Sequence, residues 1–255
     1  MNTILALILI LLAAMLLVGG WQGLKAFLSL VINFILIFLT VVLIGLNFPI
    51  LGVTLLNAVI ILAVTIYLGD DDPLTTETAF YGSVLVMALV VLLIIPVEHW
   101  AVVQGFGNEN TEDLEGLSLL VGIKFVDVAI ATTILSSLGA IAEAAIAISA
   151  GLGEILAQNP EIPAKRLFAD GIAVGKQIIG TTFNTLFFGF FGGFLGLFIW
   201  FVRLNYSWGE FLNNKIFVSE LVMILISFIG VILTIPVTTW VMQLKVRYQR
   251  TRKTH

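Results

Sequence analysis

The chain has 255 residues, of which 60% are hydrophobic and 11% charged, with a formal net charge of −4. A soluble domain carries about 25% charged residues, so this composition excludes an ordinary soluble protein. There is no cysteine, which excludes disulfides, thiolate metal sites and cysteine nucleophiles. We therefore expect a single all-α transmembrane domain over residues 1–255, with no separate soluble domain.

Eight apolar stretches follow one another along the chain, and each is long enough to cross a bilayer as a helix. They cover residues 3–20, 26–46, 49–69, 79–97, 117–137, 138–157, 178–202 and 217–242. The first stretch lacks the basic start and the cleavage site of a secretory signal peptide, so we interpret it as a retained span. The expected fold is a polytopic membrane protein of about eight transmembrane helices.

The join between the fifth and sixth stretches leaves two alternatives open. Residues 136–139 read Ser-Ser-Leu-Gly and offer almost no loop. The two stretches could form a tight hairpin of full spans, or two half-helices broken inside the membrane. Broken helices expose helix ends at membrane depth, where ions and substrates bind.

Positive charges predict the orientation, because cytoplasmic loops of membrane proteins are enriched in Lys and Arg. With the basic tail in the cytoplasm, eight spans place the N-terminus and the 98–116 and 158–177 loops on the tail's side. That side then holds Lys165, Arg166, Lys176, Lys245, Arg247, Arg250, Arg252 and Lys253. The opposite side holds Lys25, Arg203, Lys215 and the acidic turn Asp70, Asp71 and Asp72. Both termini are therefore predicted to be cytoplasmic.

Four charged residues fall within the apolar stretches: Lys124, Asp127, Glu143 and Glu154. A charge at the bilayer centre costs at least about 3 kcal/mol, so such residues usually face a bundle interior, a wet cavity or each other. Lys124 and Asp127 are three residues apart and share a helix face. They form either a structural ion pair or a pair that titrates or contacts a substrate. Glu154 either lies at the cytoplasmic interface or forms a second station on a polar track with Glu143.

Glu143 is the strongest candidate for a functional residue, because it lies in a helix made of small residues that is expected to pack tightly at the centre of the bundle. A carboxyl kept from water favours its protonated form, as a proton-coupled carrier requires. Asn184 lies among threonines of the seventh stretch and needs a hydrogen-bond partner, either an opposing backbone or Glu143. Lys176 either extends to water or joins the site. The predicted site for a small solute or ion is Glu143, Asn184, Lys124, Asp127 and Lys176.

Glycines in the last third of the chain predict close helix packing. Gly171 and Gly175 have GxxxG spacing, which lets two helix backbones approach. Gly189, Gly192, Gly193 and Gly196 alternate with phenylalanines and are interpreted in the same way.

Motifs for catalysis are absent from the sequence. Glu98 and His99 are adjacent, but no second histidine follows at helical spacing, so there is no zinc-protease motif. No Ser, His and Asp set lies within the membrane stretches, and no glycine-rich nucleotide loop occurs. We therefore expect no enzyme, no catalytic residue, no cofactor, no metal and no nucleic-acid partner.

Residues 139–186 contain a spaced pattern of more than a dozen positions. Its members are Gly139, Ala140, Glu143, Ala145, Ile148, Asn159, Pro160, Phe168, Gly171, Gly175, Lys176, Gln177, Gly180, Thr181, Asn184, Thr185 and Leu186. This pattern resembles the YibE/F family of bacterial multispan membrane proteins. The family has Asp, Arg and Asp where this chain has Glu143, Lys176 and Gln177, so the carboxylate of the family's Arg–Asp pair is absent here.

The resemblance implies a multispan membrane fold and no particular activity. Fuller family members carry an extra extracytoplasmic region after the first span, which is not found here. This suggests a chain that works beside a longer paralogue or associates with itself. We expect a transporter or permease component in the bacterial plasma membrane, surrounded by lipid. The alternative is a structural or regulatory membrane subunit that moves no solute.

Overall fold

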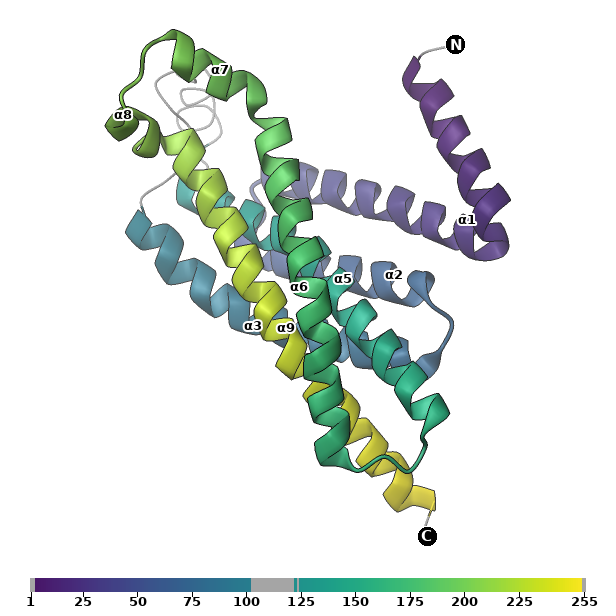
Figure 1. The fold of residues 1–255 in the computed structure, drawn as a ribbon. Helices are drawn as coiled ribbons and strands as arrows, with labels where there is room; N and C mark the ends of the chain where they lie inside the picture. Colours follow the sequence, from purple (N-terminus) through teal and green to yellow (C-terminus); the bar gives the residue numbers. More distant parts are fainter. Residues whose placement is uncertain (1–2, 102–121, 123, 254–255) are drawn as a thin grey trace.

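The computed structural model describes residues 3–101, 122 and 124–253, and the regular elements of this part are all helices. They are α1 (Thr3–Gly45), α2 (Ile50–Gly69), α3 (Pro73–Ala101), α5 (Phe125–Gln158), α6 (Ala164–Gly193), α7 (Leu195–Arg203), α8 (Trp208–Leu212) and α9 (Lys215–Lys253) (Figure 1). Among the described residues, five helices are long and apolar enough to cross a membrane, or six if α6 and α7 form one bent span. The all-α membrane fold is confirmed, with fewer long helices than the eight apolar stretches.

The first two stretches form one element, α1, with a sharp bend. Gly20 has φ 54° and ψ −130° inside the helix, a backbone conformation that glycine adopts readily and L side chains do not. Figure 1 shows the first arm turning away from the second at this point. The second arm packs against α2, where Asn57 donates a buried hydrogen bond of 2.7 Å to the Thr40 hydroxyl.

The stretches around residues 136–139 form neither a hairpin nor two half-helices. Helix α5 runs without a break from Phe125 to Gln158. The Ser136 and Ser137 hydroxyls donate to the carbonyl oxygens of Thr133 and Ile134, at 3.1 and 2.8 Å. Both polar side chains are therefore satisfied within the helix, and no proline interrupts it. Residues 117–121 and 123 of the predicted fifth span lie outside the described residues.

Helix α5 is the centre of the bundle and contacts α2, α3, α6 and α9. Its buried small residues are Ala129, Ala131, Ala140, Ala142, Ala144 and Ala145. Gly151 lies against Val174 of α6, and Ile141 lies against Gly230 of α9. The prediction of a tightly packed central helix is confirmed.

The GxxxG pair of α6 packs against α9, as predicted. A Cβ atom placed on Gly175 would lie 2.3 Å from Ile235 Cγ2, and one placed on Gly171 would lie 2.5 Å from Thr239 Cγ2. On an adjoining face of α9, a Cβ on Gly82 of α3 would lie 2.5 Å from Thr238 Oγ1. Only glycine allows these three crossings without displacing a neighbour.

The second group of glycines does not pack closely, and that prediction is wrong. Gly189, Gly192, Gly193 and Gly196 have no atom within 4 Å of an added Cβ. They lie where α6 ends and the chain bends by 53° into α7. Packing there comes from aromatic rings instead, with centroids 4.5–6.1 Å apart. These rings belong to Phe190, Phe194, Phe198, Phe211 and Phe217.

Contacts between helix ends overturn part of the predicted sidedness. Lys245, in the basic tail, forms an ion pair with Glu77 of α3, so the acidic turn lies on the tail's side and not opposite it. Arg250 donates to the carbonyl oxygens of Pro160 and Ile162 on the same side. The error follows from α5, which crosses the bundle once where two spans were expected.

The end of the bundle away from the basic tail carries α7 and α8. Helix α8 begins with a capping box, in which Glu210 N–H donates to Ser207 Oγ and the Ser207 backbone N–H donates to the Glu210 carboxylate. The Ser207 backbone N–H and the Ser207 hydroxyl both donate to the Glu210 carboxylate and lower the pKa of Glu210 from its ordinary value.

Candidate functional site

Glu143 lies near the middle of α5, and its side chain is exposed at the surface of the bundle. It has no hydrogen bond or ion pair with any described residue. Exposed residues at helical spacing continue above and below it along α5. We call this stripe the Glu143 face, and it consists of Ser136, Gly139, Glu143, Ala150 and Glu154. The predicted central residue therefore opens to the side of the bundle.

Helix α6 lies beside α5, and its predicted residues are also exposed. Asn184 Nδ2 donates a 2.9 Å hydrogen bond to the carbonyl oxygen of Gly180, one turn earlier in its own helix. The expected pairing of Asn184 with Glu143 is therefore not formed, and an internal backbone acceptor takes its place. Lys176 and Gln177 are exposed on the same helix.

Lys124 and Asp127 lie at the start of α5, away from the middle of the helix. Lys124 is the exposed N-cap residue, and its carbonyl oxygen accepts a 3.1 Å hydrogen bond from the Asp127 N–H. The two side chains form no ion pair in the described part of the chain. Asp127 occupies the first helical turn, where a negative charge is stabilised by the helix dipole.

Glu154 lies one turn before the end of α5 and accepts a 2.9 Å hydrogen bond from Gln158 Nε2. Both side chains are exposed. Glu154 therefore lies near the end of the helix, and its place at the membrane interface stays a prediction.

Glu98 is the buried carboxyl among the described residues. The sequence pattern drew attention to it only as the neighbour of His99, in connection with the absent zinc-protease motif. Its side chain near the end of α3 is 2% exposed. Oε1 accepts a 2.7 Å hydrogen bond from the Thr133 hydroxyl of α5, and Oε2 is buried without a partner among the residues that the structure describes. Glu98 continues the four-residue spacing of Val90 and Ile94, which are both buried. That spacing is the signal that could have revealed it.

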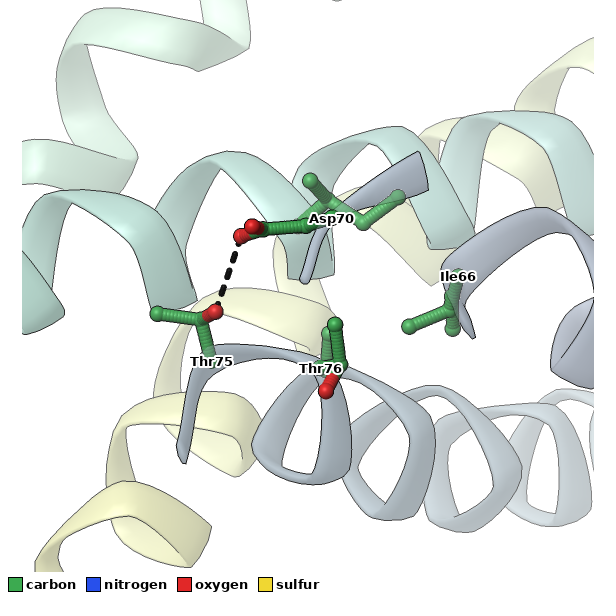
Figure 2. A pocket seen from close by; sticks show the side chains of 6 residues that line it. Ile66, Asp70, Thr75 and Thr76 are labelled. Atoms are coloured by element: carbon green, nitrogen blue, oxygen red, sulfur yellow. Dashed lines mark hydrogen bonds between the residues drawn. The ribbon is translucent and has the colours of Figure 1, made fainter. Parts of the chain in front are cut away.

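A narrow recess lies between α2, α3 and α5 near the acidic turn. Its lining residues are Ile66, Asp70, Thr75, Thr76, Ala79 and Ile146. Figure 2 shows the Thr75 hydroxyl donating to Asp70 Oδ2, at 2.9 Å. Asp70 and Thr75 bond to each other at the start of α3. We therefore interpret the recess as part of the turn that caps this helix.

Metal-ligating side chains do not gather in the described residues, where no group of three or more His, Cys, Asp or Glu occurs. The candidate polar groups are thus the exposed Glu143 face and the buried Glu98–Thr133 pair.

The apolar helices around α5, which are long enough to cross a membrane, are typical of a membrane protein. A family model described as YibE/F-like protein matches residues 7–248. The chain therefore belongs to the YibE/F-like family, as the sequence pattern predicted. Comparison with curated proteins and with solved structures gave no match.

Proposed function

We propose that this protein is a transporter or permease component of the bacterial plasma membrane, and that another membrane subunit completes its polar site at the Glu143 face. One observation carries the proposal: a carboxyl in the middle of the central helix points out of the bundle without a partner among the described residues. Against lipid, such a charge would cost at least about 3 kcal/mol. A second subunit over this face would shield Glu143 and leave a polar path between the two chains.

The neighbouring surface of α6 suits this arrangement. Thr181 and Thr185 donate to carbonyl oxygens of their own helix, of Ile178 and Thr181 respectively, and Asn184 donates to Gly180. Their remaining acceptor sites are exposed and could receive hydrogen bonds from a solute or from a partner helix. Lys176 supplies a positive charge on the same helix.

The covering subunit is a second copy of this chain or a longer YibE/F-like paralogue. Either partner would be a multispan protein. At this contact it would face protein, so it would expose no charge of its own to lipid. Small residues on the Glu143 face, including Gly139 and Ala150, would allow a partner helix to approach closely.

Loss of the Glu143 charge tests the transport function. Cells that express the chain are compared with empty-vector cells for the accumulation of a panel of ions and small metabolites. Glu143→Gln should abolish every difference in solute accumulation that the unsubstituted protein produces relative to the empty vector. Glu161→Gln, in the exposed turn between α5 and α6, should keep it. A Glu143→Gln protein that is inserted normally and keeps the full difference would exclude Glu143 from the site.

The open face also favours the alternative, a structural or regulatory subunit that assembles without moving a solute. The two functions differ in one result. An assembly that forms in Glu143→Gln and moves nothing from the panel, with or without the substitution, would support the alternative.

The orientation that we propose places the basic tail in the cytoplasm, because Lys245, Arg247, Arg250, Lys165 and Arg166 gather at that end. The acidic turn between α2 and α3 is then cytoplasmic too, and α7 and α8 lie on the external side.

A further inference from the structure

We propose that Glu98, held by Thr133, is a proton-binding site inside the helix bundle. The site is separate from the Glu143 face, and the inference does not depend on transport by that face. Glu98 lies near the end of α3, and Thr133 lies in the third turn of α5. The ligand is a proton, bound and released by the Glu98 carboxyl.

Burial carries the first step of the argument. The Glu98 side chain is 2% exposed, and Thr133 is 1% exposed. An isolated carboxylate moved from water into an apolar environment costs so much that the group takes up a proton instead. Neither ion pair of the described residues includes Glu98, so no described cation compensates for a negative charge there.

The two carboxyl oxygens have different environments. Oε1 accepts a hydrogen bond from the Thr133 hydroxyl at 2.7 Å, whereas Oε2 is buried with no hydrogen-bond partner in the described part of the chain. Buried polar atoms in native proteins nearly always have a partner. A proton on Oε2 removes the negative charge that has no counter-ion, and the Thr133 hydroxyl keeps the carboxyl in one orientation.

The charged groups on the surrounding helices are few. On α5, Asp127 and Lys124 lie about two turns before Thr133, and α2 has no charged residue. The contacts of Gly82 with Thr238 and of Gly230 with Val90 define the α3–α9 register. Continuing this register along both helices places Glu98 beside the turn of α9 that contains Glu220. His99 is adjacent but exposed.

Infrared spectroscopy of the purified full chain tests the site directly. A protonated carboxyl has a carbonyl stretch that a carboxylate lacks, and the band should disappear as pH is raised. Glu98→Gln should remove this component of the titration. Glu154→Gln, which changes an exposed carboxyl, should keep it. Replacing sodium by choline should leave the titration unchanged.

Thr133 variants provide a second readout that keeps Glu98 intact. The Thr133 hydroxyl donates to the carboxyl and stabilises its ionised form, so Thr133→Val should move the half-loss of the band to higher pH by about half to one unit. Thr133→Ser keeps the donor and should not move it. A Glu98→Gln spectrum identical to the unsubstituted protein, or equal titrations of Thr133→Val and Thr133→Ser, would overturn the proposal. So would a titration that depends on sodium.

Discussion

Lys245 of α9 forms an ion pair with Glu77 of α3 and lies 5.6 Å from the centroid of the Tyr81 ring. This contact joins the basic tail to the helix that follows the acidic turn. It therefore shows that the α2–α3 turn and the tail share one side of the bundle, and the first prediction concerns this sidedness.

Thiol labelling should find the α2–α3 turn and the tail on the same side of the membrane. The chain has no cysteine, so single-cysteine variants report one position each. Gly69→Cys and Gln249→Cys should react with a membrane-impermeant maleimide from the same side. Gly209→Cys in α8 should react from the other side. Labelling of Gly69→Cys together with Gly209→Cys would contradict the arrangement of helices.

Gly175 should be much less tolerant of a side chain than Gly180 of the same helix. An added methyl on Gly175 meets Ile235 of α9, whereas the position of a methyl on Gly180 is open. Gly175→Ala should destabilise the fold by about 1–3 kcal/mol through overpacking, seen as a lower melting temperature in detergent. Gly180→Ala should be neutral or stabilising, since alanine favours the helix. Equal melting temperatures would contradict the close α6–α9 crossing.

The bend in α1 should depend on Gly20. A side chain in the Gly20 conformation costs about 1–3 kcal/mol, and the described residues of the first arm before the bend are not buried. Near the bend the Met15 carbonyl lies against Gly23. The strain should outweigh this contact, and Gly20→Ala should straighten the helix. Spin labels at positions 8 and 34 should then move apart toward about 39 Å, the length of 26 helical residues. Gly19→Ala, whose added methyl meets no atom, should keep the shorter distance.

Composition and hydropathy predicted the membrane fold well, because a helix satisfies the backbone hydrogen bonds of a long apolar run inside a bilayer. Small residues also predicted the central position of α5 and the Gly171–Gly175 crossing. The continuity of α5 was missed for a physical reason. Ser136, Ser137 and Gly139 are typical of a turn, but inside a helix the serines can bond to the preceding backbone carbonyls.

The site could be predicted less well from the sequence than the fold. Hydropathy indicates that a charge lies in an apolar stretch, but it does not indicate which way the side chain points. Glu143, Asn184 and Lys176 are exposed, whereas Glu98, at the end of a stretch, is buried. Direction depends on which helices surround α5, and that follows only from the tertiary packing.

Photo-cross-linking from the Glu143 face tests the central claim most directly. A benzophenone maleimide is attached to Gly139→Cys, one turn from Glu143, and to the control Leu92→Cys on the exposed side of α3. After illumination in native membranes, Gly139→Cys should give a protein adduct that mass spectrometry identifies as this chain or a YibE/F-like paralogue, and Leu92→Cys should give lipid adducts. Lipid adducts alone from Gly139→Cys would mean that the Glu143 face is bare, and would contradict the proposed shared site.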